Sequence, residues 1–190
     1  MSLTDIFSSD GEGRFPRHAF WTHCFATGLI SKSIAMRIGY TKVEEVFIQG
    51  LLHDIGKIVL DRYAHEEFEK VMAMVETEEC LLVDAEEAEF GFTHAEVGAH
   101  VLKQWNLPKS ICRVAALHHR PEDAGEEKTE TAIVHLADIL CRAKGIGNGG
   151  DRRIPVLSSQ AWEELGLKWE GVASIMSEAE SFGTTGVMLL

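Results

Sequence analysis

Apolar residues in this chain recur at helical spacing, in segments that begin at Pro or end at Gly. The longest segment lies between Pro16 and Gly39, and its repeated positions fall at three- and four-residue steps: Phe20, Cys24, Thr27, Ile30, Ile34 and Ile38. Similar signals predict further helices ending near His53, from Thr93 to about Asn106, from Pro108 to His118–His119, from about Thr131 to Lys144, around Trp162–Leu165 and around Trp169–Glu180. No segment alternates convincingly as a strand would. We therefore expect an all-α fold.

Three four-residue patterns predict where helices begin. In a capping box, the side chain at each end of the pattern bonds to the backbone at the other end. Thr41–Glu44 is expected to open the helix that ends near His53, and Thr93–Glu96 the helix that follows Thr93. Asp84–Glu87 is a weaker example of the same pattern.

The composition limits the kinds of partner. With 190 residues, 45% apolar and 25% charged, the chain has the size and balance of one soluble domain. Its 30 acidic and 18 basic residues give a net charge of −12, which argues against general nucleic-acid binding and against an anionic membrane surface. A phosphate ligand is compatible with this charge where a metal supplies positive charge.

The sequence carries no signal for export or for a membrane. The cysteines form no Cys-x-x-Cys pair, and Met1–Arg14 lacks the apolar core of a signal peptide. No apolar stretch is long enough to span a membrane. We expect a cytoplasmic protein.

Several ionisable residues lie where the helical pattern predicts burial. They are His23, His53, Asp54, His94, His118, His119 and Asp138. Taken singly, each has an ordinary explanation, since a lone histidine on an apolar face is usually a core or helix-end residue, and Asp54 is as well explained as a helix N-cap. Asp138 is harder to explain, because aspartate is a poor residue inside a helix. Together they resemble the mixed imidazole and carboxylate sets with which helical bundles bind metals. Nitrogen and oxygen ligands without thiolate suit Fe, Mn, Zn, Ni or Co.

His53 and Asp54 end a strongly apolar helix, which gives the pair a specific use. Neighbouring residues inside a helix point about 100° apart, but a turn of the backbone at a helix end lets both face one site. The imidazole can then bind one ion while the carboxylate bridges to a second. Lys57 follows one turn later, where its ammonium group is expected to hold a phosphate oxygen.

Linked motifs along the chain resemble the HD superfamily of metal-dependent phosphohydrolases, and more narrowly its HDOD subgroup, the HD-related output domains of bacterial signal transduction. The motifs are Phe20-Trp-Thr-His23, Gly50-Leu-Leu-His-Asp-Ile-Gly-Lys57, Phe92-Thr-His-Ala-Glu-Val-Gly98, Trp105-Asn-Leu-Pro108, His118-His-Arg-Pro121 and His135-Leu-Ala-Asp138. The resemblance covers about residues 15–147 and implies a compact HD-type helical bundle with a metal site buried between helices. We expect residues 148–190 to be a C-terminal helical extension packed on the same domain, and residues 1–14 a polar N-terminal segment.

The resemblance also implies a role for each site residue. His23, His53, Asp54 and Asp138 would ligate a first metal ion. In relatives with two ions, Asp54 would bridge to a second ion held by His94, His118 and His119. Lys57 would take the substrate phosphate. The cofactor is thus expected to be one or two transition-metal ions, divalent or mixed-valence: Fe, Mn, Ni, Co or Zn.

Two departures from the family pattern affect the functional prediction. HDOD proteins usually carry a helical segment before the Phe-Trp-x-His motif, and only a short polar stretch precedes it here, which leaves open whether the chain is a fragment. The cyclic-dinucleotide phosphodiesterases carry Gly-Tyr-Pro after their paired histidines, whereas this chain reads Arg120-Pro-Glu-Asp-Ala-Gly125. That specific activity is not expected.

Three functions remain open. In the first, the chain hydrolyses a phosphate ester or nucleotide at a one- or two-metal centre. In the second, it is a non-enzymatic signalling module, braced by a structural metal and read by a partner protein. In the third, the histidines are ordinary structural residues. His18, His65 and His100 are expected to lie outside the site, His135 to support it or to be a core residue, and Arg120 to face solvent.

Overall fold

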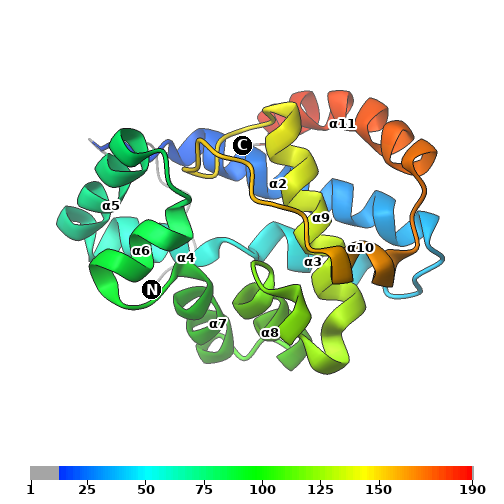
Figure 1. The fold of residues 1–190 in the computed structure, drawn as a ribbon, viewed down its shortest axis with the longest axis horizontal. Helices are drawn as coiled ribbons and strands as arrows, with labels where there is room; N and C mark the ends of the chain where they lie inside the picture. Colours follow the sequence, from blue (N-terminus) through cyan, green and yellow to red (C-terminus); the bar gives the residue numbers. More distant parts are fainter. Residues whose placement is uncertain (1–12, 190) are drawn as a thin grey trace.

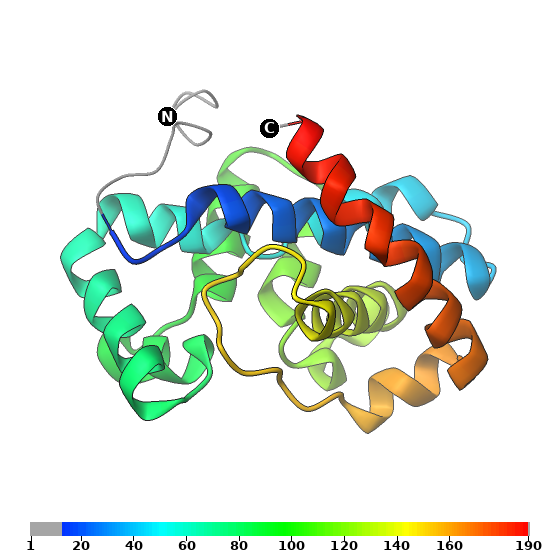
Figure 2. The ribbon, with the colours of Figure 1, turned by 90° about the horizontal axis from the view of Figure 1, so that it is seen from above.

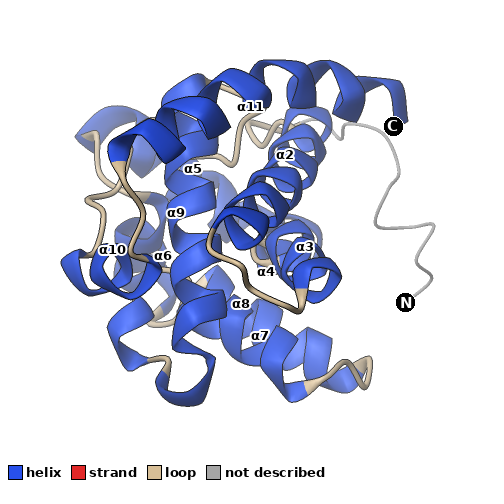
Figure 3. Ribbon diagram, turned by 90° about the vertical axis from the view of Figure 1, so that its right-hand side faces the viewer, coloured by secondary structure: helices blue, strands red, loops and turns tan. Residues whose placement is uncertain are grey.

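The computed structural model describes residues 13–189, and their side chains as far as residue 179. This part of the chain forms helices and loops without any strand (Figure 3), which confirms the all-α prediction. The α-helices are α2 (Arg17–Arg37), α3 (Val43–Leu52), α4 (Ile55–Tyr63), α5 (His65–Glu78), α6 (Leu82–Phe90), α7 (His94–Gln104), α8 (Lys109–Leu117), α9 (Lys128–Lys144), α10 (Ser159–Leu165) and α11 (Trp169–Leu189). Short 3₁₀ turns cover Pro121–Asp123 and Gly125–Glu127.

The helix predicted between Pro16 and Gly39 is present as α2. It ends before Gly39, whose φ of 72° lies in the left-handed region that favours glycine. α9 begins at Lys128, earlier than the predicted Thr131, because the preceding 3₁₀ turn runs directly into it.

The capping box predicted at the start of α7 is formed. The backbone N–H of Thr93 donates to the Glu96 carboxylate at 2.8 Å, and the Thr93 side chain completes the box. The box predicted at Thr41–Glu44 is wrong, because α3 begins at Val43 without a side-chain cap. Glu44 instead accepts a hydrogen bond from Lys32 of α2, at 2.6 Å.

The start of α6 also differs from the prediction. The box expected at Asp84–Glu87 is wrong, because α6 already begins at Leu82. The backbone N–H of Leu82 donates to Oδ1 of Asp151, at 2.7 Å. A residue far along the chain thus satisfies this helix end.

Two apolar clusters make up the core. One is built mainly from α2, α3, α9, α10 and α11, and the other from α2, α4, α5, α6, α7 and α8. α2 belongs to both, with Phe20 and Cys24 in the second cluster and Ile30 and Ile34 in the first. His23 therefore lies on the part of α2 that packs in the second cluster, just before the first cluster begins at Ala26.

The arrangement of the helices around α2 is visible in two views. Figure 1 shows α9 crossing α2, and Figure 2 shows α11 lying across α2 on another side. Val172, Ile175 and Ala179 bury the inner face of α11 in the first cluster. Within the described part of the chain, no helix combines the length and the apolar character that crossing a bilayer requires.

A contact without side chains joins α4 to α7. A Cβ atom on Gly56 would lie 1.9 Å from the carbonyl oxygen of His94 and 2.8 Å from the backbone nitrogen of Gly98. No other residue fits there unless the helices separate. This close approach brings the start of α7, with His94, against the start of α4, with Asp54.

Replacing Gly56 by Ala is expected to destabilise the fold by about 2 kcal/mol or more, because the added methyl group meets backbone that cannot move alone. The measurement is urea denaturation followed by circular dichroism. Gly171→Ala is the matched control, since Gly171 also lies in a helix but its nearest neighbour would be 3.6 Å from the new Cβ. That change should leave stability within about 1 kcal/mol. Equal midpoints for the Gly56→Ala variant and the parent chain would contradict the packing described here.

Candidate metal centre

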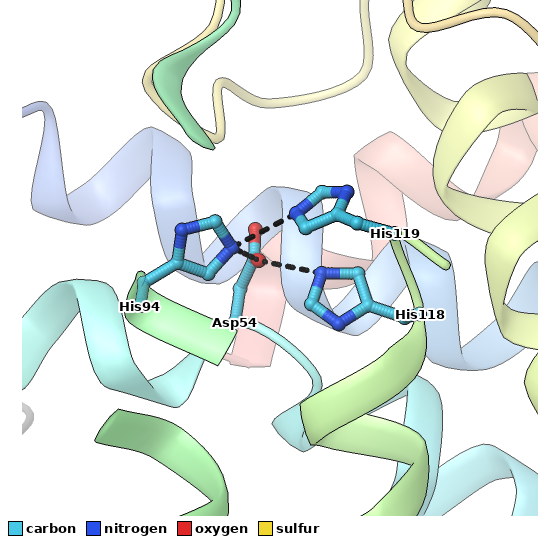
Figure 4. A group of neighbouring side chains, drawn as sticks. All are labelled: Asp54, His94, His118 and His119. Carbon is cyan, nitrogen blue, oxygen red and sulfur yellow. Dashed lines mark hydrogen bonds and ion pairs between the residues drawn. The ribbon is translucent and has the colours of Figure 1, made fainter. Parts of the chain in front are cut away.

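The structure brings all seven predicted ligand residues together. They form two groups in which the ligand atoms lie within 4.8 Å of one another. One group is Asp54, His94, His118 and His119 (Figure 4), and the other is His23, His53 and Asp138. Every member is buried except His119, which is partly exposed.

Asp54 joins the two groups, because each of its carboxylate oxygens faces one of them. Oδ2 lies 3.3 Å from Nε2 of His53 and 3.8 Å from Nε2 of His23. Oδ1 lies 3.1 Å from Nε2 of His94 and 3.4 Å from Nε2 of His118. We call His23, His53, Asp138 and Oδ2 of Asp54 the first half-site, and His94, His118, His119 and Oδ1 of Asp54 the second half-site.

The backbone at two helix ends turns the imidazoles toward this centre. His53 and His118 directly follow α3 and α8, where the last carbonyl groups of a helix lack partners within the helix. Nδ1 of His53 lies 2.7 Å from the carbonyl oxygen of Gly50, and Nδ1 of His118 lies 2.8 Å from that of Ala115. In the neutral form of each ring, Nδ1–H donates to the carbonyl and the lone pair is on Nε2, which faces the centre.

His94 is oriented by a carboxylate instead. Both its backbone N–H and its Nδ1 lie within hydrogen-bond distance of Oε2 of Glu86, at 2.8 and 2.6 Å. Nε2 of His94 is left facing Asp54 and lies 3.0 Å from Nε2 of His119. A histidine whose far nitrogen donates to a carboxylate is a common arrangement for a metal ligand.

The buried polar atoms at the centre fit a metal. Nε2 of His23, His53 and His118, and Oδ1 of Asp54, lie near one another or near other ligand atoms but form no well-aligned hydrogen bond with the described residues. Such atoms are costly to bury without a partner, and a cation between them would supply one. The donor set of imidazole nitrogen and carboxylate oxygen is the set expected for Fe, Mn, Co, Ni or Zn.

The imidazoles within each half-site differ in ionisation. Burial opposes a charge on His94, but the carboxylate of Glu86 outweighs it and raises the pKa of His94, whereas burial lowers the pKa of His23. Burial lowers the pKa of His118 to about 4 and holds that of His119 well below its usual value. Burial also opposes a charge on His53, but the carboxylates of Asp54 and Asp138 outweigh it and raise the pKa of His53 to about 9. Burial would raise the pKa of Asp54, but the positive charges of His53 and Lys57 outweigh it and keep that pKa well below its usual value. At neutral pH the second half-site thus holds neutral imidazoles at His118 and His119, and the first half-site holds one proton on His53.

Lys57 lies beside the first half-site and is fully buried. Its ammonium nitrogen lies 2.7 Å from Oδ2 of Asp54, 2.9 Å from the carbonyl oxygen of Gly149 and 3.5 Å from Oδ2 of Asp151. An ammonium group has three donors, and here each has a protein oxygen near it. A phosphate could contact Lys57 only after Gly149 moves away.

Arg142, Asp151 and Glu86 complete the surroundings, and the sequence analysis did not single them out. Arg142 donates to Oδ1 of Asp138 at 2.9 Å and lies 3.1 Å from Oδ2 of Asp151. Its position four residues after Asp138 on one helix face was a usable signal. Nothing in the sequence pattern indicated Asp151 or Glu86.

Two further residues named from the sequence, His135 and Arg120, lie near the centre. Nδ1 of His135 is 2.8 Å from the carbonyl oxygen of His118, and its Nε2 accepts a hydrogen bond from the backbone of Ser158. His135 therefore supports His118 and is not among the seven grouped residues. Arg120 is exposed and lines a cavity of about 530 Å³ that His119 also lines.

Comparison with known proteins identifies the family. A family model described as the HDOD domain matches residues 1–121, which is more than half of the chain. The chain is also 27% identical, over 151 residues, to an uncharacterized protein of Treponema pallidum. That alignment covers 74% of this chain but only 29% of the Treponema protein, so the chain spans less than a third of that relative.

Two solved structures are similar over nearly the whole chain. An HDOD domain protein of unknown function from Geobacter sulfurreducens has a TM-score of 0.86 and 27% identity, covering 99% of this chain and 67% of that one. A protein from Shewanella amazonensis, provisionally named a phosphohydrolase, has a TM-score of 0.75 and 18% identity, covering 97% and 68%. The second likeness concerns the fold alone. The family match and the helical architecture agree, and the chain belongs to the HDOD family of HD-related signalling domains.

Proposed function

We propose that this chain is a metal-dependent phosphohydrolase that cleaves a phosphate ester or nucleotide. The observation that carries the proposal is the position of Asp54, whose two oxygens face two separate sets of imidazole nitrogens. A carboxylate in that position can bridge two cations. The provisional name of the Shewanella amazonensis protein, which has the same fold, is in keeping with this activity.

The metal and the protein would divide the chemistry between them. The two half-sites would hold the ions, and a pair of ions would supply an activated water and a counter-charge for the phosphoryl group. The chain orients the ligands: Gly50, Ala115 and Glu86 hold the Nδ1 side of three imidazoles. Lys57 holds Oδ2 of Asp54 in place, and the partly exposed His119 connects the second half-site with the neighbouring cavity.

One observation favours the non-enzymatic alternative, a signalling module with a structural metal. The first half-site is closed by Gly149, and Lys57 has no donor left for a ligand. An ion held there would brace α2, α4 and α9 without contacting a substrate. The two functions make different predictions for hydrolysis and the same prediction for metal content.

Asp54→Asn is expected to lower the ion content of both half-sites, because it removes the negative charge of the carboxylate that belongs to both. His119→Gln is expected to affect the second half-site only. Metal per chain is measured by elemental analysis of protein purified without chelator. His65→Gln is the control, since His65 bonds to Asp61, away from the centre, and should leave the metal content unchanged.

Hydrolysis of phosphate monoesters by the same preparations then separates the two functions. The Asp54→Asn variant is expected to lose about two orders of magnitude or more in kcat/KM with added metal. A parent chain that holds metal but cleaves no ester or nucleotide would favour the signalling module. Full metal content in the Asp54→Asn variant would show that the ligand assignment is wrong.

Metal uptake is also expected to release protons. The pKa of His53 is raised to about 9, so at pH 7.5 its imidazole is protonated and must lose that proton before Nε2 can bind a cation. Titration calorimetry in two buffers of different ionisation enthalpy should show about one proton or more released per chain, and affinity should weaken as the pH falls. Uptake that releases no proton at pH 7.5 would exclude His53 as a ligand.

A further inference from the structure

The first half-site is closed to a substrate by the segment that follows α9. A Cβ atom on Gly149 would lie 3.3 Å from Nε2 of His23 and 3.5 Å from Oδ2 of Asp54, so the backbone of this residue lies directly against the ligands. The segment is held in place, because the N–H of Asn148 donates to the carbonyl of Ala19 at 2.9 Å. Asp151 adds contacts to Arg142 and to the start of α6.

The second half-site, in contrast, has a path to solvent. His119 is its partly exposed member and lines the cavity of about 530 Å³. Thr93 and Ala95, the neighbours of His94 in the chain, line the same cavity. Nε2 of His118 and Oδ1 of Asp54 belong to this half-site, and both residues are fully buried. The half-site that a ligand can reach from solvent thus also contains buried polar atoms that lack a well-aligned hydrogen bond with the described residues.

The charges around the cavity are mostly negative. Asp84, Glu87 and Glu96 line it, together with a single cation, Arg120. Arg120 already has the carboxylate of Asp123 at 4.0 Å, and Glu96 is held in the capping box. The side chains of Asp84 and Glu87 are exposed and make no hydrogen bond or ion pair with the described residues. They are available to a ligand.

Much of the remaining wall is apolar, and the size of the cavity suits a small molecule. Leu81, Val83, Pro155 and Val156 line the cavity along with the acidic groups. A volume of this order accommodates a ligand the size of a sugar or nucleoside. Carboxylates beside apolar surface favour a ligand part that is uncharged or cationic and donates hydrogen bonds, and they repel additional negative charge.

We propose that the substrate is a phosphate monoester that enters through this cavity, and that its remaining part is neutral or cationic and lies against Asp84 and Glu87. Polyphosphates and esters with a second anionic group are disfavoured. The position of the substrate's phosphate group rests on the proposed phosphohydrolase function. The preference for a neutral or cationic group in the rest of the substrate follows from the cavity alone.

The test compares two small monoesters of similar size and opposite distal charge. O-Phosphoethanolamine carries an ammonium group, and phosphoglycolate carries a carboxylate. Binding to the metal-loaded full chain is measured by calorimetry, and hydrolysis by phosphate release. Phosphoethanolamine is expected to bind about tenfold more tightly, from the charge difference at the cavity.

Replacing both Asp84 and Glu87 by their amides should bring the ratio of the two dissociation constants close to one, without changing the metal content. Because both side chains are exposed and make no hydrogen bond or ion pair with the described residues, the variant should fold normally. Glu89→Gln is the matched control, since Glu89 lies on the same helix, pairs with Lys70 at 3.5 Å and does not line the cavity. Ala116→Phe, which fills part of the cavity, should weaken binding of both esters while leaving the metal in place.

The outcomes separate this inference from the proposed function. Preferential binding of phosphoethanolamine without hydrolysis would support the role given to the cavity and contradict the proposed phosphohydrolase function. Hydrolysis of both esters at equal kcat/KM, or faster hydrolysis of phosphoglycolate, would overturn the cavity assignment and keep the activity. If neither ester binds, or if Ala116→Phe has no effect on binding, the proposed route is wrong.

Discussion

The candidate centre depends on a single buried carboxylate. Asp54 is fully enclosed, and an isolated charge in such a place would be neutralised or expelled. It remains ionised because Lys57 and a protonated His53 lie next to one oxygen. The other oxygen has no ammonium group beside it and faces Nε2 of His94 and Nε2 of His118 (Figure 4). This asymmetry makes the two half-sites chemically different although they share a ligand.

The fold supplies that arrangement through helix ends more than through helix faces. His53 and Asp54 lie between α3 and α4, His94 begins α7, and His118 follows α8. Helix ends have free backbone groups that can orient a side chain, and they allow neighbouring residues to turn toward one point. The apolar clusters on either side fix where those ends meet, and the close crossing at Gly56 sets the distance between α4 and α7.

The helical class could be predicted from local patterns, and the seven side chains that meet at the centre from those patterns together with the linked motifs. Ionisable residues such as His23 and Asp138 stand out against an apolar helical background. What could not be predicted are contacts made by the chain after it folds. Asp151 caps α6 from a distant loop, and Glu86 reaches His94 from the neighbouring helix. The capping pattern at Thr41 failed for the same reason, since Lys32 of another helix takes the Glu44 carboxylate.

The anchoring of Asp151 has a mechanical consequence. One oxygen of this carboxylate faces Lys57 and Arg142, which touch the acidic ligands of one half of the centre, and the other accepts the first N–H of α6. α6 in turn carries Glu86, which orients His94 in the other half. A displacement of Asp151 would therefore affect one half of the centre directly, through Lys57 and Arg142, and the other half through α6 and Glu86. A partner that binds residues 145–157 and moves Asp151 would therefore change the positions of side chains in both half-sites.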